Sequence, residues 1–120
     1  MATITTKLSL AGTGLTSNQL SLNINDLLSV TTPHVGLSKL SIAHTGQEEL
    51  IAASVGTATY IYIRNTDVTN FIVLKNAAGN IWGRLHPGEA ILYCITPSVG
   101  MEVTADTAPC VIEYAYWTKA

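Results

Sequence analysis

Turn signals recur at short intervals along the chain, and this spacing limits what the chain can fold into. Gly, Pro, Asn, Asp and Thr cluster in "GTG" at 12–14, "TTPHVG" at 31–36, "HTGQ" at 44–47, "NTDVTN" at 65–70, "NAAGN" at 76–80, "HPGE" at 86–89 and "TPSVG" at 96–100. The segments between these turns have the length of β-strands. About eight to ten short strands without a convincing helix predict an all-β sandwich or barrel.

Hydrophobic alternation places the expected strands more closely. The strands predicted in the second half of the chain are residues 60–64, 71–75, 81–85, 90–95, 101–104 and 110–118. Near the N-terminus, apolar residues share one parity at Ile4, Leu8 and Leu10 and again at Leu20, Leu22 and Ile24. Residues 20–28 also fit a helix capped by Ser17 or Asn18, but the intervening Asn and Ser residues favour a strand.

The chain of 120 residues has the length of one domain, so residues 1–120 are expected to form a single antiparallel β-sandwich. A jelly roll is favoured, because its two sheets contain about eight strands. An immunoglobulin-like sandwich is the alternative. Its usual Cys and Trp pattern is missing, because Cys94 and Cys110 are close in sequence and Trp82 precedes both.

The composition indicates surface that a partner covers. Hydrophobic residues make up 48% of the chain and charged residues 12%, against about 25% charged in an ordinary soluble domain. The mean hydropathy is +0.32.

Six scattered cationic residues and a net charge of -2 argue against nucleic-acid binding. Residues 50–63, the longest apolar stretch without charge, are too short for a membrane span.

The N-terminus lacks the basic start and apolar run of a secretory signal, so synthesis and folding in a cytoplasm are expected. Cys94 and Cys110 are then expected to be reduced residues of the core, and a disulfide between them is the minor alternative.

No pattern of catalytic or ligand-binding residues emerges. His34, His44 and His86 could suggest a metal, but no HxH pair is present, and "HPGE" reads as a tight turn with Pro second and Gly third. Glu48 and Glu49 are adjacent and point to opposite sides of an extended segment. Nucleophile elbows and phosphate-binding loops are missing too. We therefore expect a protein without enzymatic activity, cofactor or metal.

Aromatic residues are the remaining candidates for a functional surface. Tyr60 and Tyr62 share one strand face, Tyr114 and Tyr116 share another, and Trp117 lies on the opposite side of the last strand. Such residues serve either core packing or an interface, and exposed ones can also stack on sugars. The candidate subunit interface comprises Tyr60, Tyr62, Arg64, Tyr114, Tyr116 and Trp117.

Three stretches carry a family resemblance: "YIYIRNTDVTNFIVLKN", "GRLHPGEAILYCI" and "ADTAPCVIEYAYW". With them, residues 35–117 resemble small virion proteins of tailed bacteriophages, namely capsid decoration (cement) proteins and related head or tail components with a jelly-roll fold. The resemblance implies a non-enzymatic homotrimer, without cofactor, that reinforces the capsid at junctions of the major capsid protein. It also implies synthesis in the bacterial cytoplasm and a final place on the capsid surface. Residues 1–25 match least, and whether they form an extended segment that reaches a neighbour stays open.

The two faces of the strand predicted at residues 60–64 have different expected neighbours. We expect Ile61 and Ile63 to face the core, and Tyr60, Tyr62 and Arg64 to face a neighbouring subunit, although parity alone also allows the reverse. Two other functions stay open: a tail or neck component, and a glycan-binding jelly-roll module.

Overall fold

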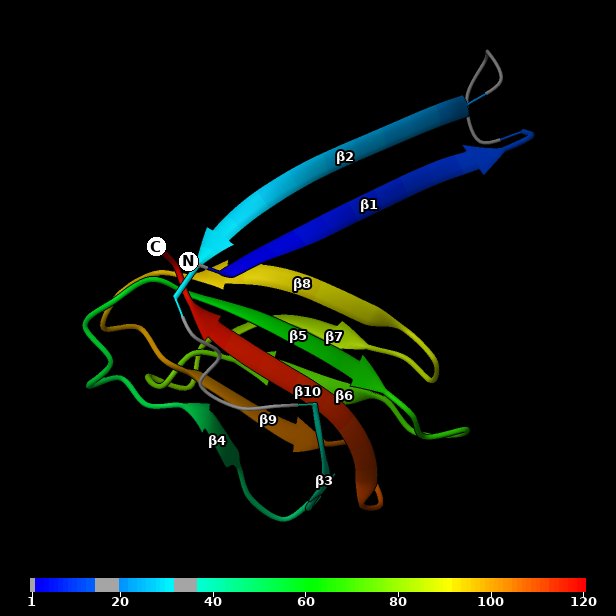
Figure 1. Cartoon of the computed structure of the whole chain (residues 1–120). Helices are drawn as coiled ribbons and strands as arrows, with labels where there is room; N and C mark the ends of the chain where they lie inside the picture. The colour runs from blue at the N-terminus through cyan, green and yellow to red at the C-terminus, as the bar shows by residue number, and fades with distance from the viewer. Residues whose placement is uncertain (1, 15–19, 32–36) are drawn as a thin grey trace.

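The structure is a computed structural model, and it describes residues 2–14, 20–31 and 37–120. Within these ranges it contains ten β-strands and no helix, arranged as a two-stranded arm and two four-stranded antiparallel sheets (Figure 1). The strands are β1 (Ala2–Gly12), β2 (Leu20–Val30), β3 (Ser38–Ile42), β4 (Glu48–Ile51), β5 (Thr59–Asn65), β6 (Ile72–Lys75), β7 (Ile81–Leu85), β8 (Ala90–Ile95), β9 (Met101–Ala105) and β10 (Cys110–Thr118). The prediction of an all-β fold with an antiparallel β-sandwich is confirmed.

The two larger sheets share one winding pattern. Sheet I has the strand order β3-β10-β5-β8, and sheet II has the order β4-β9-β6-β7. The pairs β3·β10, β4·β9, β5·β8 and β6·β7 are nested, with the last strand on the first and the innermost pair joined by a short turn. The chain thus runs as one antiparallel double strand of four successive pairs. The β5·β10 pairing joins the first and third pairs in sheet I, and the β6·β9 pairing joins the second and fourth pairs in sheet II.

The core lies between these sheets and consists mainly of aliphatic side chains. Ile61 and Ile63 of β5 are completely buried, as are Ile72 of β6 and Ile112 of β10. Alternation along β5 sends Tyr60, Tyr62 and Arg64 outward, and none of these three is buried. The expectation that Ile61 and Ile63 face the core is therefore confirmed, and the reverse assignment is wrong. Contact of the outward side with a neighbouring subunit stays a prediction.

The "HPGE" turn has the predicted form. The Glu89 amide donates to the His86 carbonyl at 3.0 Å, and Gly88 has φ of +82°, which a glycine at the third position of this turn adopts without strain. The Glu89 carboxylate accepts hydrogen bonds from the His86 amide at 2.6 Å and from the exposed His86 ring at 3.0 Å. These residues close the β7–β8 turn.

A buried asparagine organises the loop after β5. Asn65 has no exposed surface, and its side-chain amide donates to the carbonyls of Asn70, at 2.9 Å, and Leu85, at 3.0 Å. Its side-chain oxygen accepts from the Asp67 amide at 3.0 Å. The "NTDVTN" turn is therefore tied to the end of β7, which lies in the opposite sheet.

Acid should weaken this loop and the "HPGE" turn. Backbone hydrogen bonds from Asn70 and Thr69 lower the pKa of Asp67, and those from His86 lower the pKa of Glu89. A carboxylate whose pKa is lowered by folding stabilises the fold above its unfolded-state pKa, about 4 here, and that stabilisation is lost as the pH falls further. We expect the urea midpoint to fall between pH 5 and pH 2, and to fall less in Asp67→Asn, whose amide oxygen still accepts these bonds. Equal acid sensitivity of the two proteins would contradict this explanation.

The arm is a hairpin of β1 and β2, paired over all 11 residues of each strand. It leaves the sandwich beside β8 and extends away from it (Figure 1). Its base is fastened to the end of β10, because the Thr31 amide donates to the Thr118 carbonyl at 2.9 Å and the Ala120 amide to the Ser29 carbonyl at 3.0 Å. Val30 is buried at this junction.

The structure decides the sequence expectations for residues 20–28 and for the two cysteines, and a third expectation lies largely outside the described residues. The helical alternative for residues 20–28 is wrong, because these residues belong to β2. Cys110 is buried as expected, but Cys94 is exposed on β8, and both thiols are free. The expected turn at residues 31–36, which includes His34, lies almost entirely outside the described residues.

Candidate interaction surfaces

The outward side of sheet I, called here the outer face, carries most of the predicted interface residues. Cross-strand pairs place Trp117 beside Tyr60, and Ala115 beside Tyr62. On the other side of β5, Leu92 pairs with Tyr62. The result is a band of aromatic and aliphatic side chains across three strands. The outer face of these strands comprises Tyr60, Tyr62, Arg64, Ala90, Leu92, Cys94, Val111, Glu113, Ala115 and Trp117.

A polar contact fixes the middle of the outer face. The Tyr62 hydroxyl donates a hydrogen bond of 2.9 Å to the Glu113 carboxylate on the neighbouring strand. Burial, and then this hydrogen bond, raise the pKa of Tyr62 above its ordinary value. Tyr62 therefore stays neutral and keeps donating to Glu113 at neutral pH, which holds its ring in one orientation.

Two of the predicted interface residues lie elsewhere. Tyr114 and Tyr116 are partly buried and pack against the core cluster, on the same side of β10 as Ile112. They do not share the outer face with Tyr60 and Tyr62, so within one chain their rings contribute to sandwich packing. Side chains alternate between the two faces along β10, so Tyr114 and Tyr116 point to the same inward side as the buried Ile112.

The arm presents a second surface, outside the predicted interface residues. Direct cross-strand pairs bring Ile4 opposite Leu28, Leu8 opposite Ile24, and Leu10 opposite Leu22. These six side chains form the apolar face of the arm. Farther from the base, Leu8, Leu10, Leu22 and Ile24 are 42–50% exposed. The opposite side of the arm is mostly Thr, Ser and Asn. The sequence shows that alternate residues of both strands are apolar, but it does not show that these strands lie outside the sandwich.

A wedge-shaped groove of about 460 Å³ opens between the arm and the outer face. One wall includes Thr6, Leu8, Ile24 and Asp26 of the arm. The other wall is formed by sandwich residues, namely Tyr62, Ala90, Ile91 and Leu92. This groove, called here the wedge, joins the apolar face of the arm to the predicted interface residue Tyr62.

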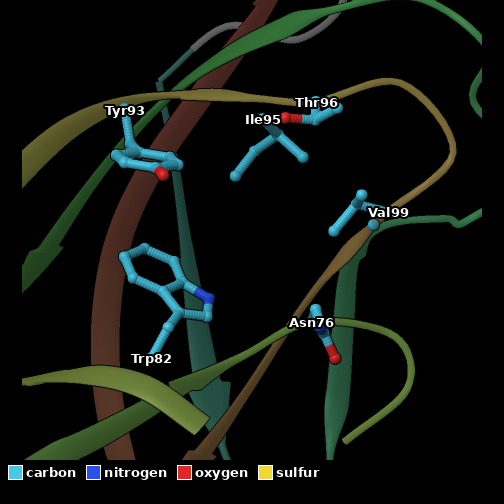
Figure 2. A pocket seen from close by; sticks show the side chains of 7 residues that line it. Asn76, Trp82, Tyr93, Ile95, Thr96 and Val99 are labelled. Carbon is cyan, nitrogen blue, oxygen red and sulfur yellow. The ribbon is translucent and has the colours of Figure 1, made fainter. Parts of the chain in front are cut away.

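A smaller cleft lies at the open edge of the sandwich, between β7 of sheet II and β8 of sheet I. Trp82 and Tyr93 stack there with ring centroids 4.9 Å apart and an angle of 28° between their planes (Figure 2). Both side chains are exposed by 41% or more. The cleft holds about 110 Å³, and Asn76 and Thr96 add polar groups to its lining. Neither aromatic residue was among the predicted interface residues.

Two kinds of chemical site can be examined among the described residues, namely metal-binding clusters and reactive thiols. They contain no group of three or more His, Cys, Asp or Glu side chains that could hold a metal ion. Burial raises the pKa of the Cys110 thiol, which disfavours the reactive thiolate. Glu48 and Glu49 are both exposed. The surfaces above are therefore the candidate functional sites.

None of the described residues forms a helix that is long and apolar enough to cross a membrane. Comparison of the chain with models of protein families, with curated proteins and with solved structures gave no match.

Proposed function

We propose that this chain is a non-enzymatic structural protein of a bacteriophage virion, a decoration protein that binds the capsid shell and reinforces it. The observation that carries the proposal is the amount of apolar surface that one chain leaves open. Both the apolar face of the arm and the outer face expose large aliphatic or aromatic side chains. Such surface in a monomer marks a site of contact with other proteins.

The winding of the sandwich supports the jelly-roll part of this proposal. Eight strands form two sheets, and the pairs β3·β10, β4·β9, β5·β8 and β6·β7 are nested. A double strand that is rolled into two sheets in this way is the arrangement we expect of a jelly roll. We therefore assign β3–β10 to a jelly roll, which agrees with the family resemblance in residues 35–117.

The proposed partners are the major capsid protein and further copies of the chain, in a homotrimer. Tyr60, Tyr62, Arg64 and Trp117 remain the predicted interface residues on the outer face. A tail or neck component would present the same fold and surfaces, and differs only in the part of the virion to which it binds.

The proposal is tested by co-sedimentation of the purified protein with phage shells that lack it. We expect saturable binding to the shells, and shells that withstand higher temperature when the protein is bound. Recovery of all of the protein in the supernatant, at concentrations up to about 100 µM, would contradict a decoration function, since it would place the dissociation constant above that of a specific interface.

The Trp82–Tyr93 cleft favours a glycan-binding module as the second candidate. Exposed aromatic rings beside uncharged polar groups suit the apolar faces and hydroxyls of a sugar. Assays of glycan binding and of shell binding separate the two functions. A glycan-binding module would bind glycans and not shells, and Trp82→Ala would abolish its glycan binding.

A further inference from the structure

The far part of the arm has little to stabilise it in water as the single chain presents it. A two-stranded hairpin on its own is marginally stable, and a third layer or strand is normally needed. Here Leu8 and Leu10 on β1 are 50% and 45% exposed, and their partners Ile24 and Leu22 on β2 are 47% and 42% exposed. The far part of the apolar face therefore needs a cover that this sandwich does not supply.

The wedge shows where such a cover must reach. Leu8 and Ile24 line it from the arm, and Tyr62 and Leu92 line it from the outer face. Whatever covers the arm on this side also contacts the outer face, because the two walls belong to one groove. A single occupant can thus bury both surfaces.

We propose that this occupant is a second copy of the chain. This assignment rests on the proposed function, and it names the partner that covers the arm before the protein binds a capsid shell. Every copy carries both the apolar arm and the apolar outer face, so copies related by rotation can each provide what the next one lacks. The arm also has to be covered as soon as the chain folds, and another copy is the partner that every preparation contains.

The available area is sufficient for a stable contact. Two strands of 11 residues make an arm face of about 36 Å by 10 Å, or about 360 Å². The four strands of sheet I offer a face of similar size, about 20 Å by 19 Å. Together they approach the roughly 800 Å² that each partner buries in a standard protein interface.

Charge also favours self-association. Asp26 lies on the arm side of the wedge, in the row between Ile4·Leu28 and Leu8·Ile24. The outer face carries Arg64, which is exposed, and Glu113, which is engaged by Tyr62. Lys7 also lines the arm side of the wedge, so the arm and the outer face each carry one cation and one carboxylate. A second copy can therefore bring Asp26 toward Arg64 and Lys7 toward Glu113, which are pairs of opposite sign.

The test compares two pairs of substitutions at adjacent rungs of the hairpin. Leu10→Asp with Leu22→Asp puts charge on the apolar face, whereas Ser9→Asp with Asn23→Asp puts the same charge on the polar face. Light scattering coupled to size exclusion should give an oligomer mass, at least twice the monomer mass of 12.8 kDa, for the wild type and for the polar-face variant. The apolar-face variant should be monomeric, with a dissociation constant raised about 100-fold or more.

A milder pair, Leu10→Thr with Leu22→Thr, keeps strand propensity and guards against a variant that simply misfolds. It should weaken association in the same direction, with near-UV circular dichroism of the sandwich unchanged. A wild type of 12.8 kDa at micromolar concentration, or a Thr variant as tightly associated as the wild type, would overturn the inference. By contrast, an oligomer that fails to bind shells would overturn the proposed function and leave this inference standing.

Discussion

Replacement of Asn65 by Leu is expected to lower the free energy of unfolding by about 3 to 5 kcal/mol. The side chain is fully buried and makes three hydrogen bonds, two as donor and one as acceptor. Leucine has a similar size but leaves the carbonyls of Asn70 and Leu85 and the Asp67 amide without these partners. Urea denaturation at a fixed protein concentration measures the loss, and a loss below about 1 kcal/mol would contradict the role given to Asn65.

Two further variants separate the hydrogen bonds from the mere change of residue. Asn80→Ala, at an exposed position in the "NAAGN" turn, should change stability by no more than about 0.5 kcal/mol. Asn65→Asp keeps the acceptor for Asp67 but sets a carboxylate against two carbonyl oxygens, which raises its pKa in the folded state. A raised pKa means that stability is greatest at low pH and falls as the pH rises, so this variant should lose stability between pH 4 and pH 7.

Replacement of Gly100 by Ala is expected to lower the free energy of unfolding by about 3 kcal/mol. Gly100 has φ of +72°, which costs a residue with a β-carbon energy at any position. In addition, that carbon would lie 2.9 Å from the Ala53 amide nitrogen and 2.9 Å from the Ile51 carbonyl oxygen, which are backbone atoms that cannot easily move. Thermal or urea denaturation gives the loss.

Gly79 provides the matched control for Gly100. Its φ is +85°, but a β-carbon there would meet nothing within 4 Å. Gly79→Ala therefore carries the backbone strain without the clash, and should cost about 1 kcal/mol. Equal losses for the two variants would show that close packing of the "TPSVG" turn against the β4–β5 connection contributes nothing.

The fold was largely predictable because its strands are short, alternating and separated by turns with specific chemistry. The predicted ranges 81–85, 90–95 and 110–118 coincide with β7, β8 and β10, since each has Gly, Pro or Asn within two residues of at least one of its ends. "HPGE" was predictable for the same reason. The pairing of strands was not, because nested partners such as β3 and β10 lie far apart in sequence and no local signal links them.

The interaction surfaces were only partly predictable. Alternation assigned Tyr60 and Tyr62 to one face, and burial of Ile61 and Ile63 decided which face it was. Tyr114 and Tyr116 were predicted as interface residues from their aromatic character. They share the parity of Ile112, whose burial in the structure places them against the core. The arm shows the limit of such reasoning. A half-apolar strand has the same pattern whether it covers a core or projects from it, and only the structure distinguishes these cases.

The proposal that this chain reinforces a phage capsid can be tested by cryo-electron microscopy of virions produced by a phage that encodes the chain. We expect many symmetry-related copies on the outside of the shell, at junctions between capsid subunits, with the arm of each copy covered by a neighbouring copy. Copies confined to the tail or neck, or virions without the protein, would contradict it.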